Sequence, residues 1–223
     1  GINAIELANA LRVEYKTSFV LAHKLRSVMD AEASTVVLEG TVEIDGAEIG
    51  GYIRPKNVRK KKGDFWRYPY RHNSRKQVAI AMTERGGRTL SFVAKSESAA
   101  VPDIRARLRK GAVIHADSAA CWNVLEAHFS MKRINHKECF WTPEASTNGS
   151  ENFFSLMRRT ANGTHHHISG KYLHHYLARL AWRKSFRLLS NRTLVESACA
   201  LIGQFNPRDM KGYWQRSRKE STT

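Results

Sequence analysis

Cysteine is scarce in this chain, and its placement excludes two classes of small protein. Cys121, Cys139 and Cys199 lie far apart and form no C-x2-C pair, so the sequence predicts neither a zinc knuckle nor a disulfide framework. An apolar run of about 18 residues or more is also missing, so no segment is predicted to span a membrane. We recognise no signal peptide, and these absences together favour a reducing, cytoplasmic setting.

Acidic residues are also in short supply, and the imbalance points to the kind of partner. Lys and Arg number 37 against 20 Asp and Glu, which gives a net charge of +17 and a pI of about 10.2. This charge favours a polyanion, either nucleic acid or an anionic membrane, over a basic surface that is merely solvated. We expect nucleic acid. The 42% hydrophobic content predicts one sizeable domain, with room for a small appendage.

Three acidic residues stand in different local contexts against this basic background. Asp45 ends the apolar and acidic alternation of residues 41–45, Asp117 closes the short apolar run 112–117, and Glu151 opens a helical pattern. Taken singly, each has an ordinary interpretation as a surface strand residue, a helix N-cap or a helix-start charge. Taken together, they favour a metal site, because carboxylate oxygens around Mg²⁺ can cut and join phosphodiesters.

Residues 3–29 predict two helices at the start of the chain. Asn3 followed by Glu6 is a capping-box pattern. The pair resembles a helix-turn-helix, and we assign residues 1–33 to a DNA-binding segment. An ordinary helical hairpin is the alternative. The predicted DNA contacts of the second helix are Lys16, Lys24 and Arg26. Because the chain begins inside this module without Met, we expect further residues upstream.

Residues 54–76 are basic and rich in aromatic side chains, without periodicity. We expect a mobile basic loop, because its charges repel one another. Cations interleaved with aromatic rings suit a surface that follows a nucleic-acid backbone and stacks on bases, and a solvated insertion is the alternative. The predicted DNA contacts in this loop are Arg59, Lys60, Lys61, Lys62, Arg67 and Arg71.

The order of the predicted elements indicates the fold class. A strand at 41–45 and a hairpin with a Gly-Gly turn come first, and helices and strands alternate afterwards. This order predicts an α/β fold, a ribonuclease-H-like mixed sheet with helices on both faces, over residues 34–195. The predicted hairpin strands are 77–83 and 89–94, the later strands are 112–116 and 131–135, and the helices are 98–109, 119–127, 149–161 and 168–189. We expect a basic C-terminal tail at 196–223.

Other polar residues near the three acids suggest supporting roles. Arg158 follows Glu151 by seven residues, close to two helical turns, so it shares a face with Glu151 and we expect it, with Arg159, to hold DNA. His115 either lines the site or is a buried, hydrogen-bonded histidine. The run 165–167 of three histidines is not predicted to be a metal site, because adjacent histidines on a turn rarely share one ion.

Five segments together resemble the DDE transposases of bacterial insertion sequences, in the branch called ISXO-like. The resemblance rests on residues 43–51, 115–118, 134–137, 147–159 and 166–169. It implies metal-dependent cleavage and strand transfer of a DNA element, with Mg²⁺ or Mn²⁺, two ions in all, at Asp45, Asp117 and Glu151. It also implies an accessory role for Asn148, double-stranded DNA as element end and target, a homo-oligomer and a prokaryotic, nucleoid-associated protein.

The chain departs from the family at two places. Family members usually carry Glu directly after the first Asp, where this sequence has Gly46, and they usually carry a zinc ribbon before the helix-turn-helix, which fits a chain that is truncated upstream. Two alternatives therefore stay open: a structure-selective nuclease of the same fold, and a DNA-binding protein that has lost its chemistry.

Overall fold

The computed structural model describes residues 2–50, 76–134, 146–205 and 210. The predicted basic loop lies outside the described residues from position 54 to 75, and with it Arg59, Lys60, Lys61, Lys62, Arg67 and Arg71. The end of the predicted tail, residues 211–223, lies outside them as well.

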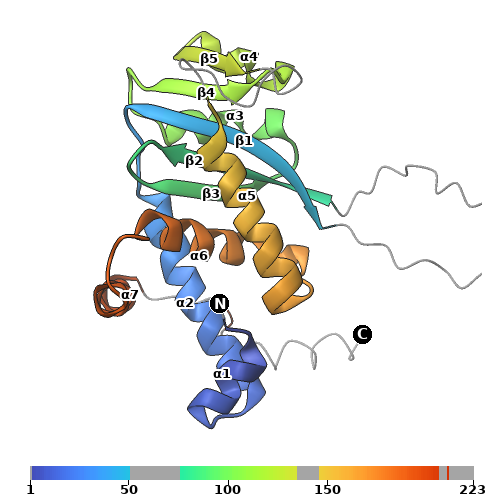
Figure 1. Ribbon diagram of the computed structural model, residues 1–223, viewed down its shortest axis with the longest axis vertical. Helices are drawn as coiled ribbons and strands as arrows, with labels where there is room; N and C mark the ends of the chain where they lie inside the picture. The colour runs from blue at the N-terminus through green and yellow to red at the C-terminus, as the bar shows by residue number, and fades with distance from the viewer. Residues whose placement is uncertain (1, 51–75, 135–145, 206–209, 211–223) are drawn as a thin grey trace, which may run out of the picture.

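A five-stranded mixed sheet occupies the upper half of the molecule in Figure 1. The strands are β1 (Thr41–Gly50), β2 (Lys76–Glu84), β3 (Thr89–Ala94), β4 (Val113–Asp117) and β5 (Ser130–Ile134). They lie in the order β3-β2-β1-β4-β5, with β1, β2 and β3 antiparallel and β1, β4 and β5 parallel. This topology confirms the predicted ribonuclease-H-like sheet.

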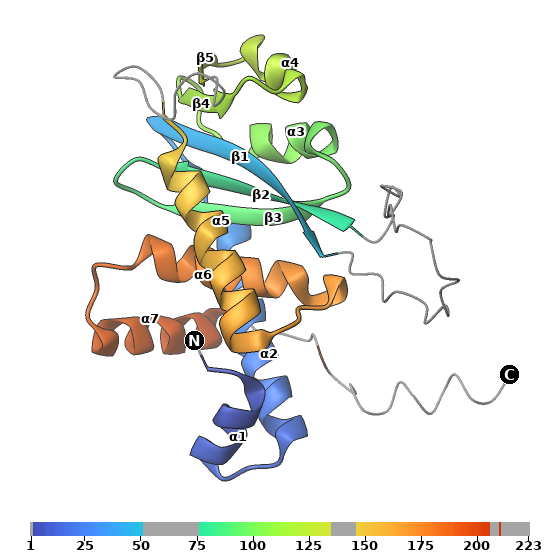
Figure 2. The same cartoon turned by 45° about the vertical axis from the view of Figure 1, so that its right-hand side comes forward.

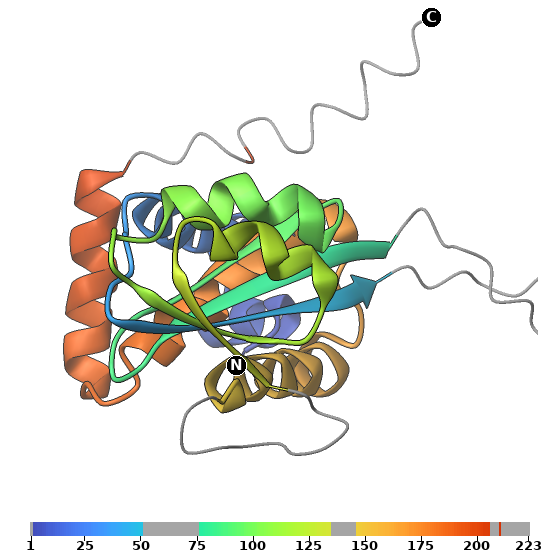
Figure 3. The same cartoon turned by 90° about the horizontal axis from the view of Figure 1, so that it is seen from above.

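Helices cover both faces of the sheet, as predicted (Figure 3). The helices are α3 (Glu97–Ala106), α4 (Asn123–Glu126), α5 (Asn148–Thr160) and α6 (Leu173–Ser185). Along β2, Ile80 and Met82 join the core under α3, whereas Ala79 and Ala81 pack with Phe153 under α5 and α6. Alternate residues of a strand face opposite sides, so one strand serves two cores.

Several predicted boundaries differ from the observed ones. β1 continues to Gly50 because its residues from Val42 to Gly50 pair with β2. The predicted helix 168–189 is shorter: a π turn at Ala161–His165 and a 3-10 turn at Gly170–Tyr172 come first, and α6 then runs over 13 residues. At the β2–β3 turn, Gly86 has a φ of +76°, a conformation that favours glycine.

The N-terminal helices α1 (Ala4–Leu11) and α2 (Tyr15–Ser34) form the predicted helix-turn-helix pair (Figure 2). Asn3 and Glu6 make the predicted capping box. The Ser18 hydroxyl donates to the carbonyl of Ala4 at 2.7 Å, which ties the two helices together. α2 is longer than α1, and it also packs on α6.

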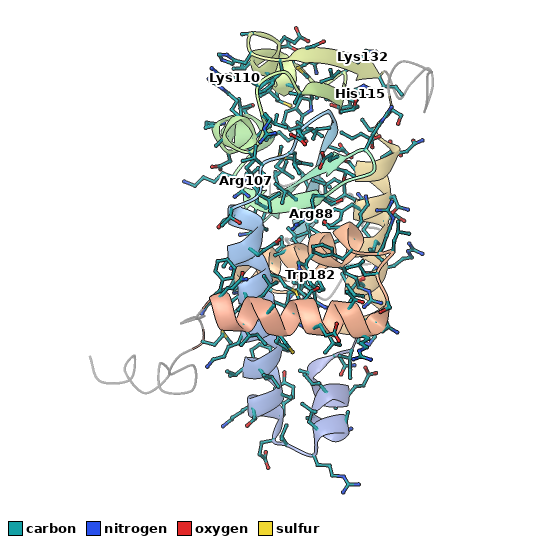
Figure 4. All side chains as sticks on the ribbon, turned by 90° about the vertical axis from the view of Figure 1, so that its left-hand side faces the viewer. Arg88, Arg107, Lys110, His115, Lys132 and Trp182 are labelled. Atoms are coloured by element: carbon teal, nitrogen blue, oxygen red, sulfur yellow. The ribbon has the colours of Figure 1, made fainter. Side chains whose placement is uncertain are left out.

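A further helix, α7 (Asn191–Gln204), was not predicted, and it occupies the first residues of the segment expected to be a tail. Figure 4 shows α7 lying across α2, close to Trp182 of α6. Val28, Trp182 and Leu201 form a small core between the three helices. None of the helices in the described ranges combines the length and apolar content needed to cross a bilayer.

Candidate active site

The parallel pairing of β1 and β4 places two of the predicted acids side by side. The register pairs Ile44 with Ala116, so Asp45 and Asp117 are the next residues along neighbouring strands and share one face of the sheet. Glu151 lies in the first turn of α5, which packs across β1 and β2. The three acids therefore reach the same edge from three separate elements.

A cavity of about 370 Å³ opens beside Asp45. Glu151 and Arg158 line it together with Asp45, as the seven-residue spacing on α5 predicts. The other lining residues are Gly46, Ala47, Phe154 and Ser155. Two carboxylates and one guanidinium thus face one space, a combination that can hold a cation and an anionic group next to each other.

The electrostatics of Asp45 show that negative charges gather here. Burial raises the pKa of Asp45 from 3.8 to about 6. The N–H of Gly46 donates to Oδ1 at 2.8 Å and works against that rise, whereas the charges of Asp117, Glu151 and Glu97 add to it. A carboxylate in this position gains from a bound cation, because the cation offsets both its burial and its neighbours' charges.

The carboxylate of Asp117 is held by two hydrogen bonds. Its Oδ1 accepts from the indole Nε1 of Trp122 at 2.9 Å and from the N–H of Ala119 at 3.2 Å. Trp122 itself is fully buried. Both bonds use the same oxygen, so the orientation of the carboxylate is set without engaging Oδ2, the oxygen suited to a metal.

Glu97 is a fourth acid at this edge, and the sequence did not reveal it. It lies in the first turn of α3, and its Oε1 would be only 2.3 Å from a Cβ added to Gly46. Oε2 accepts a hydrogen bond from the thiol of Cys121 at 3.1 Å. Burial, followed by the effect of Glu97, raises the pKa of Cys121 to about 12, so the thiol stays protonated and is a poor nucleophile.

Glu43 anchors the start of α5 to β1. It is 4% exposed. Its carboxylate accepts hydrogen bonds from the N–H of Gly149 at 2.5 Å, from Nε of Arg85 at 3.2 Å and from the hydroxyl of Ser146 at 3.2 Å. The Ser150 hydroxyl also donates to the Glu43 carbonyl at 3.0 Å. These bonds fix the turn of helix that carries the third predicted acid.

His115 belongs to this supporting network and not to the cavity beside Asp45. It is 3% exposed, and its Nδ1 lies 3.2 Å from both the Ser146 N–H and Nη2 of Arg85. Two donors at Nδ1 place the proton of the neutral ring on Nε2. Burial and the charge of Arg85 both lower the pKa of His115. Of the two predicted possibilities, the buried, hydrogen-bonded histidine is the one observed.

Asn148 lines another cavity than Asp45, and Arg26 is buried, contrary to its predicted role as a DNA contact. Asn148 lines a separate cavity of about 790 Å³, which also contains Arg179, Arg183 and Lys184 and which does not include Asp45. Arg26 is 5% exposed, and its guanidinium lies 4.2 Å from the centre of the ring of Tyr176. Arg26 therefore packs between α2 and α6, and we remove it from the predicted DNA contacts. The predicted cations that are exposed in the described residues are Lys16, Lys24, Arg158 and Arg159.

The donor set of the sheet edge consists of carboxylates, which suit hard divalent ions such as Mg²⁺ and Mn²⁺. Within the described ranges, only a set on α2 and α6 has three metal-binding atoms within 4.8 Å of one another, and Asp45, Asp117 and Glu151 are not that set. Asp45 and Glu151 line the cavity, and Asp117 lies beside Asp45 on the neighbouring strand. The three side chains offer the hard oxygen ligands that Mg²⁺ prefers.

The chain is similar to known transposases in sequence. The family model of the ISXO2-like transposase domain matches residues 37–185. No curated protein matches the chain. Among solved structures, the crystal structure of the Mos1 strand transfer complex aligns with 89% of this chain and 74% of that chain, at 10% identity and a TM-score of 0.32. The family match spans more than half of the 223 residues and contains all three acids of the sheet edge, so the chain belongs to the ISXO2-like transposase family.

Proposed function

We propose that this protein is a DNA transposase that cuts a strand at the end of a DNA element and joins the freed end to a second duplex, with Mg²⁺ or Mn²⁺ as cofactor. The observation that carries the proposal is the convergence of Asp45 and Glu151 on one cavity with Arg158, next to Asp117 on the adjoining strand. Membership of a transposase family supports it.

Asp45, Asp117 and Glu151 would hold two divalent ions through their carboxylate oxygens. When bound, such ions activate the attacking oxygen and stabilise the leaving oxygen of a phosphodiester. Asp45 lies between the other two acids, on the strand that pairs with β4 and packs under α5, so it is the natural shared ligand. Asp117 is oriented by Trp122.

The reaction has two steps, and each step forms one P–O bond and breaks another. Water attacks phosphorus at the element end, the P–O bond to the departing 3′ oxygen breaks, and that oxygen leaves as a 3′-hydroxyl. This hydroxyl then attacks a phosphodiester of the target, forms a new P–O bond and displaces a target 3′-hydroxyl. In both steps Arg158, which lines the cavity, pairs with a non-bridging phosphate oxygen and holds the DNA strand in place.

Glu43 and Glu97 are positioning residues in this scheme. Glu43 holds the first turn of α5 through the Gly149 N–H, and that turn carries Glu151. Glu97 occupies the space beside Gly46 and increases the negative field at Asp45. We further propose double-stranded DNA as the partner, contacted by exposed cations such as Lys16 and Arg159, and a homo-oligomer as the working form.

Strand transfer tests the proposal directly. A labelled duplex that ends in the sequence bordering the coding region is incubated with plasmid DNA, Mg²⁺ or Mn²⁺ and protein, and joined products are separated on a gel. We expect joining by the wild type and none by Asp117→Asn, with DNA binding retained. Asp103→Asn, at an exposed position of α3, is the matched control and should join normally.

The other outcomes identify the alternatives. Cleavage without joining would replace the transposase by a nuclease of the same fold. DNA binding with neither reaction would indicate a binding protein that has lost its chemistry. Joining by Asp117→Asn at the wild-type rate would refute the assigned role of that carboxylate.

A further inference from the structure

Two helices on the far side of the molecule from β4 bring a second set of metal-binding side chains together. Asp30 of α2 and His174 and His175 of α6 offer one ligand atom each, and these atoms all lie within 4.8 Å of one another. α2 and α6 pack closely along their length, and both belong to the described core of the fold (Figure 1). No other such set occurs in the part of the chain that the structure describes.

The chemistry of this set differs from that of the sheet edge. Two imidazoles and one carboxylate are typical ligands of Zn²⁺ and related transition metals, whereas Mg²⁺ prefers oxygen ligands alone. The two adjacent histidines suit a shared ion here because their ring centres lie only 3.9 Å apart, at an interplanar angle of 38°. The third ligand, Asp30, comes from another helix. The histidine run at 165–167 has no such partner in the set.

A third imidazole next to the set supports a ligand in this interface. His23 lies seven residues before Asp30, on the same face of α2, and its ring centre is 5.6 Å from that of His175. It is fully buried, and neither of its ring nitrogens has a hydrogen-bond partner. A buried unpartnered imidazole is costly unless something binds it.

The same interface also contains a positive charge, which disfavours a bound cation. Arg26 lies between His23 and Asp30 on α2, and its guanidinium is held over the ring of Tyr176 at 4.2 Å. A cation bound here would be repelled by the guanidinium of Arg26, and the carboxylate of Asp30 supplies the negative charge that compensates this repulsion. The proposed site therefore needs all three side chains: Asp30 supplies the negative charge, and the two histidines supply the nitrogen ligands.

We propose that Asp30, His174 and His175 form a binding site for Zn²⁺ or a similar divalent transition metal that fastens α2 to α6. The occupied site would fix the N-terminal helix pair relative to the sheet, because α2 carries that pair and α6 packs on β3. The proposal goes beyond the transposase function and does not depend on it.

Metal titration tests the site without any activity measurement. To remove competition from the sheet edge, all variants carry Asp45→Asn and Asp117→Asn. Zn²⁺ binding is followed by calorimetry and by the thermal midpoint, and Co²⁺ is used as a spectroscopic probe, because its visible absorption depends on its ligands. The test variant is His174→Ala with His175→Ala, and the matched control is His166→Ala with His167→Ala, which removes two exposed histidines elsewhere.

We expect one Zn²⁺ per chain and a thermal midpoint that rises with Zn²⁺ and not with Mg²⁺. The test variant should lose at least tenfold in affinity, and the control variant should lose none. Asp30→Asn, which preserves shape, should weaken binding at least tenfold as well, and it decides the matter if the double histidine variant fails to fold. Equal Zn²⁺ affinity in Asp30→Asn and its parent, or in the test and control pairs, would overturn the proposal.

Discussion

Replacing Asp45 by Asn should stabilise the metal-free protein while it destroys the proposed activity. The folded protein raises the pKa of this carboxyl from 3.8 to about 6, so above pH 6 folding must bury a charge that the site disfavours. The difference between the two pKa values corresponds to about 3 kcal/mol. Asn keeps the oxygen that accepts from the Gly46 N–H and removes the charge.

The stability difference between the wild type and the Asp45→Asn variant should depend on pH. The raised pKa means that the unfolded state releases its proton first, so the cost of Asp45 is absent below pH 3.8, grows as the pH rises to about 6 and is complete above it. Thermal unfolding of both proteins in EDTA at a series of pH values measures this. At pH 8 we expect the Asn variant to melt higher by up to about 6 to 12 °C, for about 3 kcal/mol in a chain of this size, and at pH 3.5 we expect no difference.

Metal ions should reverse the order. Mg²⁺ or Mn²⁺ should raise the midpoint of the wild type at pH 8 and leave the Asp45→Asn variant nearly unchanged, because binding to the folded state alone adds to stability. Asp103→Asn, at an exposed position, should behave like the wild type throughout. Equal stability of the wild type and Asp45→Asn in EDTA at pH 8, or a gain of the same size at pH 3.5, would refute the electrostatic account.

Two further substitutions test residues that support the site, and a third tests an ion pair between α2 and the β2–β3 turn. Glu43→Gln should cost about 1 to 3 kcal/mol in urea unfolding and reduce strand transfer, because it weakens a buried acceptor of three hydrogen bonds; full stability would contradict the anchoring role. Gly46→Ala should raise the metal concentration needed for activity about tenfold with little effect on folding, because its Cβ displaces the flexible end of Glu97; an unchanged metal requirement would exclude Glu97 from the site. Arg88→Met should lower the free energy of unfolding by about 1 to 2 kcal/mol, because Nη2 of Arg88 donates to both carboxylate oxygens of Glu32 at 2.6 and 2.8 Å. An unchanged free energy of unfolding would mean that solvent replaces this ion pair.

The sheet was predictable because its signals are local. Alternation along 41–45, the Gly-Gly turn and the short apolar run before Asp117 each depend on neighbouring residues, and the succession of these elements along the chain indicated the mixed sheet. The short spacing from Glu151 to Arg158 worked for the same reason, since helical geometry alone puts both on one face.

What the sequence did not reveal depends on contacts between distant segments. Glu97 reaches the site only because Gly46, far away along the chain, leaves room for it. Arg26 looks like a DNA contact in a basic helix, and only the packing of α6 buries it against Tyr176. The helix at 191–204 is placed by contacts with distant segments, because Leu201 packs with Val28 of α2 and Trp182 of α6.

The bond from Trp122 to Asp117 has an evolutionary consequence. The indole ring is part of the main hydrophobic core, and its N–H orients a carboxylate proposed to bind metal. A substitution that reshapes the core around this ring will therefore also move that carboxylate. Selection for chemistry thus extends into residues that touch neither metal nor DNA, and core mutations tolerated in a simple scaffold will be removed here even when the protein still folds.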